Sequence, residues 1–307
     1  MWTYSIRRLL GAIPTLLAVV TVSFFMMRLA PGGPFDRERM LNPEIEANIR
    51  KAYDLDQPLV VQYGLYLGRA LKGDLGPSFK YQDYTVTELI ATGFPVSFRI
   101  GIAAIILALI VGIATGILAA LRQNSLIDHL VMAAAMTGIT IPNFVVAPLL
   151  ALVFGLYFRL LPVGGYGDGS LRYLILPIIA LALPPLAAIA RLTRGSMIEV
   201  LRANYIRTAR AKGLPGRLVI LRHALRPALL PVVSYLGPAI AGIITGSVVI
   251  EQIFGIPGIG RYFVQGALDR DYTLVMGVVI FYGALIILLN LAADLVYGLI
   301  DPKVRYD

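Results

Sequence analysis

The sequence contains no cysteine among its 307 residues and only two histidines. Without thiols the chain has neither a disulfide framework nor a thiolate metal site. The histidines, His129 and His223, are far apart in the sequence, so we interpret each as a surface or packing residue rather than a metal ligand. Charge is scarce as well, because charged residues make up 15% of the chain, against about 25% in ordinary soluble domains.

Common catalytic motifs are also missing. The sequence has no His-Glu-x-x-His, no Gly-x-Ser-x-Gly and no Walker-type Gly-x-x-x-x-Gly-Lys-Ser/Thr motif. The segment 255–260 reads Gly-Ile-Pro-Gly-Ile-Gly and superficially resembles a phosphate loop. Because it contains a proline and follows an apolar run rather than a strand, we interpret it as a tight turn or re-entrant element. We therefore expect a protein that is not an enzyme and that binds no cofactor and no metal.

The sequence contains six long uncharged runs, and its mean hydropathy is +0.77. Each run approaches or exceeds the roughly 20 residues that a helix needs to cross about 30 Å of hydrocarbon. Backbone groups in lipid must be satisfied within their own segment, so these runs are predicted to be helices. The first run is too long for the core of a secretory signal, and we expect it to be retained. The six runs are Leu9–Met27, Ile100–Leu121, Leu130–Phe158, Tyr173–Ala190, Pro227–Ile250 and Tyr272–Ala293.

Ionisable side chains are nearly absent from the middle of these runs. Arg99 and Glu251 fall near predicted outer ends, and Asp294 falls near an inner end. Ion-coupled carriers, proton pumps and voltage sensors need such groups at mid-depth. The sequence also shows no inverted repeat of the kind found in many secondary carriers. A stand-alone channel or secondary carrier is therefore the less favoured alternative, and a scaffold subunit stays open.

The distribution of charge predicts the topology. With the N-terminus inside, the cytoplasmic segments are 1–8, 122–129, 191–226 and 294–307. These segments hold 14 of the 27 Lys and Arg residues but only 5 of the 18 acids, so the whole net charge of +9 lies on one side. Lys and Arg mark the cytoplasmic side. We therefore place both termini in the cytoplasm, and the positive charge is explained without nucleic-acid binding.

The chain divides into three parts by composition. Residues 1–29 form the N-terminus and first transmembrane helix, 30–98 a small extracytoplasmic subdomain, and 99–307 a five-helix core with a cytoplasmic loop at 191–227. Within the subdomain we predict two helices, the first after Asn42-Pro43 and the second from Val60 to Leu71. The alternative is a disordered loop.

The loop 191–227 carries nine basic residues against one acid. Within it we predict a short helix on which Leu201, Tyr205, Ala209 and Gly213, spaced by four, form an apolar stripe. The residues Arg202, Arg207 and Arg210 are expected to project elsewhere, and Gly213 to end the helix. Such a helix fits a cleft in a cytoplasmic partner. The alternative is an amphipathic helix on anionic lipid.

These residues resemble the coupling loop of ATP-binding-cassette importer permeases. The loop carries Arg207-Thr208-Ala209-Arg210-Ala211-Lys212-Gly213, where the commonest form of the motif begins Glu-Ala-Ala, so only Ala209 and Gly213 match strictly. The sequence of residues 207–213 is similar to that of the B-type permeases of oligopeptide and dipeptide importers. Further matches along the chain are Arg28-Leu29-Ala30-Pro31-Gly32, Gly73-Asp74-Leu75-Gly76-Pro77-Ser78-Phe79, Thr140-Ile141-Pro142, Val249-Ile250-Glu251 and Asp301-Pro302-Lys303.

The resemblance implies a type I importer permease fold in a bacterial inner membrane. It also implies four protein partners: a C-type permease, two ATPase subunits and an extracytoplasmic peptide-binding protein. The substrate would be a peptide that passes between two lipid-embedded permeases, with dipeptides, nickel or glutathione as alternatives. The residues that would couple the permease to the ATPase are Arg202, Tyr205, Arg207, Ala209, Arg210 and Gly213, whereas the sequence does not identify the substrate path.

Overall fold

The computed structural model describes residues 2–29, 55–81 and 83–300, and the fold is helical throughout these ranges. The outer segment contributes α3 (Leu59–Ala70), which confirms the second of its two predicted helices, while the one after Asn42 lies outside the described residues. The long helices are α1 (Trp2–Leu29), α4 (Val86–Leu121), α7 (Leu171–Leu201), α11 (Leu230–Phe254) and α13 (Tyr272–Ile300). The shorter ones are α5 (Leu126–Thr140), α6 (Asn143–Leu150), η1 (Ala151–Tyr157), η2 (Gly167–Gly169), α8 (Asn204–Ala211), α9 (Gly216–Leu218), η3 (Val219–Ala224), α10 (Leu225–Ala228) and α12 (Ile259–Leu268).

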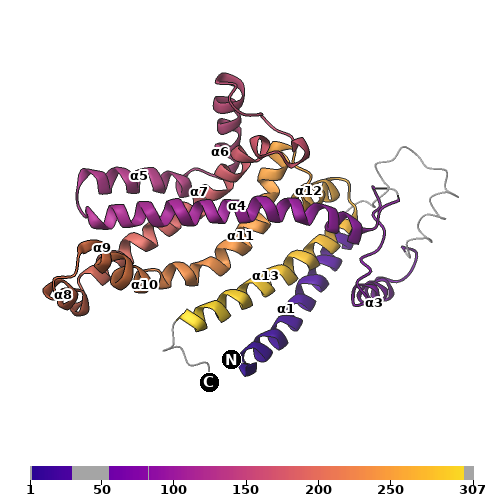
Figure 1. Cartoon of the computed structure of the whole chain (residues 1–307). Helices are drawn as coiled ribbons and strands as arrows, with labels where there is room; N and C mark the ends of the chain where they lie inside the picture. Colours follow the sequence, from indigo (N-terminus) through magenta and orange to yellow (C-terminus); the bar gives the residue numbers. More distant parts are fainter. Residues whose placement is uncertain (1, 30–54, 82, 301–307) are drawn as a thin grey trace.

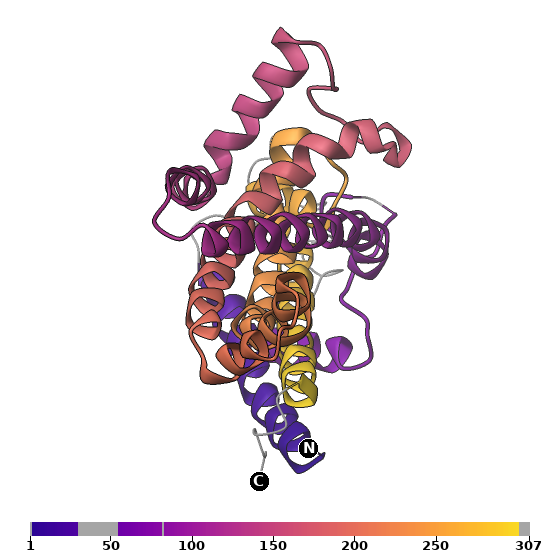
Figure 2. The same cartoon turned by 60° about the vertical axis from the view of Figure 1, so that its left-hand side comes forward.

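Five of these helices are long and apolar enough to cross a membrane, and a sixth candidate span is broken. The break separates α5 from α6 and η1 and bends the chain by 107°. Proline explains it, because Pro142 lacks an amide donor and forces Ile141 into an extended conformation (φ −93°, ψ 120°). The six predicted spans are therefore all helical, but the third is bent: α5 packs beside α4 and α7, whereas α6 and η1 turn away from α5 (Figures 1 and 2).

The helix α4 begins earlier than its uncharged run. Thr85 caps it by accepting a hydrogen bond from the Glu88 amide, and the Glu88 carboxylate accepts one from the Thr85 amide in return. This capping box satisfies two amides that the first turn would leave unpaired. The helix consequently continues without interruption from the outer segment into the core.

Close contact between α4 and α7 forms the centre of the core. At Gly112 an added Cβ would lie 2.9 Å from the Leu186 carbonyl oxygen, and at Gly116 it would lie 2.6 Å from the Ala190 carbonyl oxygen. Only glycine permits such an approach of two helix backbones, as in other membrane helix pairs. Buried apolar residues on both sides of this contact, including Ile105 and Ile189, belong to one cluster that extends to α11.

The helices α11, α12 and α13 form a second group beside this pair, and α1 lies along α13 at the edge of the molecule (Figures 1 and 2). The turn predicted at 255–260 is confirmed. Gly255, in the left-handed region (φ +65°), ends α11, and Gly258 precedes α12. The buried carboxylate of Glu251 accepts a hydrogen bond from the Gly260 amide (2.8 Å) and so fixes α12 against α11.

A buried carboxylate also holds the outer loop. Asp271, which is 0% exposed, precedes α13 and accepts hydrogen bonds from the Ser78 hydroxyl and the amides of Phe79 (3.0 Å) and Lys80 (3.2 Å). Its other oxygen accepts from the Thr273 hydroxyl and the Leu274 amide, both at 3.0 Å. Since burial of a charge is costly unless it is fully hydrogen-bonded, these five donors explain the position of the loop.

The contact at Gly116 makes a prediction about stability. We expect Gly116→Ala to lower the melting temperature of the purified chain in mild detergent, because overpacking against backbone costs about 1–3 kcal/mol. The control is Gly195→Ala in α7, where an added Cβ meets nothing within 4 Å. That control should leave the melting temperature unchanged or raise it, since alanine favours helix by about 1 kcal/mol over glycine. Equal melting temperatures for the two variants would contradict the close packing.

Candidate functional site

The basic loop 191–227 contains α8, which is followed by a tight stop. Gly213, with φ +75°, ends the helix. Its amide donates to the Arg210 carbonyl (2.9 Å), and the Leu214 amide donates to the Ala209 carbonyl (3.4 Å). This pair of bonds is the Schellman arrangement, which requires a residue in the left-handed region. The predicted role of Gly213 as the helix stop is therefore confirmed.

The predicted apolar stripe on this helix is wrong in two respects. Leu201 is the last residue of α7 rather than part of α8. Ala209 is buried against the chain's own core and is only 7% exposed. The helix turns Ala209 inward together with Ile206, which is 0% exposed, because these two positions lie on one helical face. The spacing of Ile206 and Ala209 was the signal that sequence analysis overlooked.

Beneath α8 a cluster of buried residues joins four neighbouring elements to it. Its members include Ala120 of α4, Met197 of α7, Val219 and Ala224 of η3, and Ala228 of α10. A displacement of α8 is consequently resisted by contacts that lead into these four helical segments, since closely packed interiors transmit strain.

The outward face of α8 is polar and basic. Tyr205 is 47% exposed, and partial burial of its hydroxyl raises the pKa of that group, so it stays neutral at cytoplasmic pH. Arg207 and Arg210 are exposed, as expected, with Thr208 between them. The neighbouring exposed basic side chains are Arg202, Lys212, Arg217, Arg222 and Arg226. The face combines one aromatic side chain with many cations and so suits a partner surface that carries acids.

Two polar contacts fix the same end of the bundle. Arg194 of α7 donates two hydrogen bonds of 2.7 Å each to the carboxylate of Asp128, which is 1% exposed. The same carboxylate accepts from the amide of Asn124, which adopts a left-handed conformation (φ +61°). Arg202 donates to the Gln123 side chain (3.1 Å). These contacts attach the α4–α5 turn to α7, and sequence analysis did not predict the pairing of Asp128 with Arg194.

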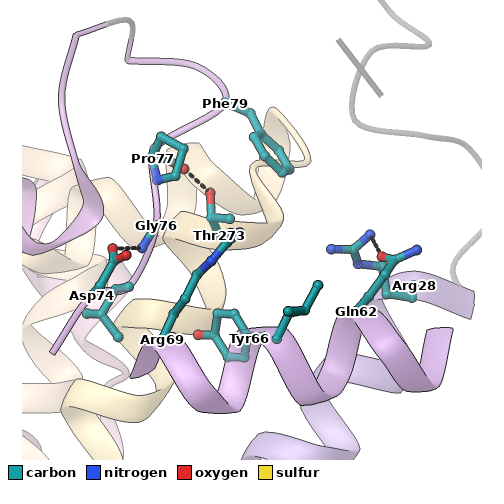
Figure 3. A pocket seen from close by; sticks show the side chains of 11 residues that line it. Arg28, Gln62, Tyr66, Arg69, Asp74, Gly76, Pro77, Phe79 and Thr273 are labelled. Carbon is teal, nitrogen blue, oxygen red and sulfur yellow. Dashed lines mark hydrogen bonds between the residues drawn. The ribbon is translucent and has the colours of Figure 1, made fainter. Parts of the chain in front are cut away.

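At the opposite end a small pocket lies between α3, the loop before α4 and the start of α13 (Figure 3). Arg28 donates to the side-chain oxygen of Gln62 there, and Thr273 donates to the Pro77 carbonyl (2.6 Å). Burial raises the pKa of the Tyr66 hydroxyl well above its usual value. Within the described ranges, no group of three or more His, Cys, Asp or Glu residues is arranged to hold a metal.

Comparison with protein families gives two matches that together cover most of the chain. Residues 112–306 match the family described as "binding-protein-dependent transport system inner membrane component". Residues 1–101 match the N-terminal membrane component of the same kind of transport system. The second match includes α1 and α3, so the outer segment is a regular part of such proteins.

Relatives with assigned names align over the full length. An oligopeptide transport system permease protein of Salmonella typhimurium is 58% identical over 306 residues, which is 100% of both chains. A dipeptide transport system permease protein of Bacillus subtilis is 45% identical over 305 residues, covering 99% of this chain and 98% of its own.

Among solved structures, an inward-facing conformation of the MetNI methionine ABC transporter has a chain with a similar fold. The TM-score is 0.56 at 16% sequence identity, and the match covers 69% of this chain and 96% of the other. At that identity the likeness concerns the fold alone, which is that of type I importer permeases.

The contact between Asp128 and Arg194 makes a testable prediction. Arg194→Met leaves a buried carboxylate without its guanidinium, and we expect a loss of about 2 kcal/mol in the free energy of unfolding. The control is Arg191→Met, an exposed position on the same helix, for which a change within about 0.5 kcal/mol is expected. Denaturant unfolding in detergent measures both. If Arg194→Met is no worse than Arg191→Met, the contact does not stabilise this end of the bundle.

Proposed function

The chain belongs to the family of binding-protein-dependent transport system inner membrane components, and we propose on this premise that it is a permease subunit of an ATP-driven oligopeptide importer. The observation that carries the proposal is full-length identity of 58% to an oligopeptide permease, against 45% to a dipeptide permease. The higher identity to the oligopeptide permease favours oligopeptides over dipeptides as the substrate. The apolar helices place the chain in the inner membrane as a multi-pass protein.

The chain itself would be non-catalytic. Its partners would be a second, C-type permease, two cytoplasmic ATPases and an extracytoplasmic peptide-binding protein. Both termini would be cytoplasmic, because the basic loop and α8 then face the ATPases. A bundle with few ionisable groups at mid-depth suits a path for varied peptides, which should bind each of them weakly.

The coupling mechanism follows from how α8 is held. The ATPase would contact the outward face, formed by Tyr205, Arg207, Arg210 and neighbouring Arg202. Ile206 and Ala209 face the buried cluster, so they would transmit the movement to α4 and α7 rather than touch the ATPase. In this proposal Ala209 acts by packing within the permease, and Gly213 acts by fixing the end of α8.

Gly213 provides a test of coupling. We expect Gly213→Asp to assemble in the membrane but to lose peptide uptake, because the side chain strains a left-handed residue and adds an anion at a helix C-terminus. Uptake and peptide-stimulated ATP hydrolysis are measured in vesicles. The matched control is Gly216→Asp at the start of α9, where the space is equally open, φ is not positive and an acid is favourable. Normal peptide uptake by the Gly213→Asp variant would show that Gly213 is not needed for coupling.

Composition of the purified complex tests the function itself. We expect the tagged chain, solubilised gently from its native host, to bring with it a second permease and two ATPases in stoichiometric amounts. Uptake of a labelled tetrapeptide by cells should then be inhibited by unlabelled tri- to pentapeptides more strongly than by dipeptides. Stronger inhibition by dipeptides, nickel or glutathione would reassign the substrate. A chain that repeatedly purifies alone would favour a stand-alone channel or carrier.

A further inference from the structure

The helix α3 has two contrasting faces, although it belongs to a segment expected to lie outside the membrane. One face packs on α1 and α13, where Tyr63, Tyr66 and Leu67 join a cluster with Phe24 and Met276. The other face is aliphatic and open. Its members, with their exposed fractions, are Val60 (74%), Val61 (45%), Leu65 (42%) and, just beyond the helix, Leu71 (89%).

The depth of α3 relative to α1 can be read from a single contact. Arg8 and Arg28 bracket the apolar part of α1, and the twenty helical steps from one to the other correspond to about 30 Å, the thickness of the hydrocarbon. The Tyr63 hydroxyl lies 2.6 Å from the Thr21 hydroxyl. Thr21 precedes Arg28 by seven residues, which places this contact about 10 Å below the outer boundary.

The direction of α3 agrees with a helix that lies along the membrane surface. Adjacent residues of α3 contact distant residues of α1: Gln62 bonds to Arg28, whereas Tyr63 reaches Thr21. This pattern requires α3 to cross α1, as Figures 1 and 3 show. A crossing helix at this depth lies within the outer leaflet rather than above it.

The composition of α3 fits the same location. Among its 12 residues Arg69 is the single ionisable side chain apart from tyrosines, and there is no acid. The apolar surface also continues onto α1, where Val22, Met26 and Leu29 are 57%, 67% and 72% exposed and recur at helical spacing. Exposed apolar side chains thus occur on both of the helices that the contact between Tyr63 and Thr21 joins.

We propose that α3 is an interfacial helix embedded in the outer leaflet, with Val60, Val61 and Leu65 in contact with phospholipid acyl chains. Arg28 and Arg69 then lie at the level of the headgroups, where cations are favoured. The helix α3 would thus attach this segment to the membrane surface. This assignment is independent of the transported substrate.

Site-specific fluorescence quenching tests the assignment, and the absence of cysteine makes single labelling sites simple to introduce. Val61→Cys and Leu65→Cys are labelled with a small fluorophore in the full chain, with its co-purifying subunits, in phosphatidylcholine nanodiscs. Val22→Cys in α1 is the lipid-facing reference, and Ser170→Cys in an exposed outer loop is the aqueous reference. We expect brominated phosphatidylcholine to quench both α3 labels several-fold more than the Ser170 label, and iodide to do the reverse.

Two results would overturn the proposal. If iodide quenches the Val61 and Leu65 labels as strongly as the Ser170 label, α3 is in water. If neither quencher reaches them, another protein subunit covers the face, and cross-linking from Leu65→Cys would identify it. The melting temperature of each labelled variant shows whether it is folded, and because both side chains are exposed we expect values close to those of the unmodified protein.

Discussion

The close approach of α4 and α7 is the constraint on which the rest of the structure depends. Gly112 and Gly116 allow backbone to meet backbone over about one turn, and α8 follows directly after α7. Without a hydrophobic driving force in lipid, such shape complementarity is a principal source of helix association. At one end the pair contributes Ala120 and Met197 to the buried cluster under α8, so α8 and the core are one packed unit.

The sequence predicted the number of spans, the helix Val60–Leu71, the turn at 255–260 and the stop at Gly213, because each depends on local chemistry. It did not predict which face of α8 is buried. That face is determined by η3 and α10, which approach α8 only in the folded chain. The contact of Asp128 with Arg194 was missed for the same reason, since its partners are 66 residues apart. The proline at position 142 marks a possible break in the third span, but the sequence does not predict the 107° angle of the bend.

The two ends of the bundle are stabilised in different ways. At the end that carries α8, exposed cations surround a small apolar cluster and the ion pair of Asp128 with Arg194. At the outer end, buried carboxylates, Glu251 and Asp271, bind backbone amides of adjacent loops. The outer end is therefore fixed by short-range hydrogen bonds that leave little freedom to the loops, whereas the inner end presents a surface on which binding energy from another protein can act.

The carboxylate of Asp271 also imposes an order on biogenesis. Its donor Ser78 is 193 residues away in the sequence, so the loop that contains Ser78 is synthesised long before its acceptor. Contacts of such high sequence separation form late. The loop therefore reaches its final position only after the last helix has been inserted, and its closure marks a completed chain. A chain that ends before residue 271 lacks the carboxylate that accepts these hydrogen bonds, so nothing in it can hold the loop in this position.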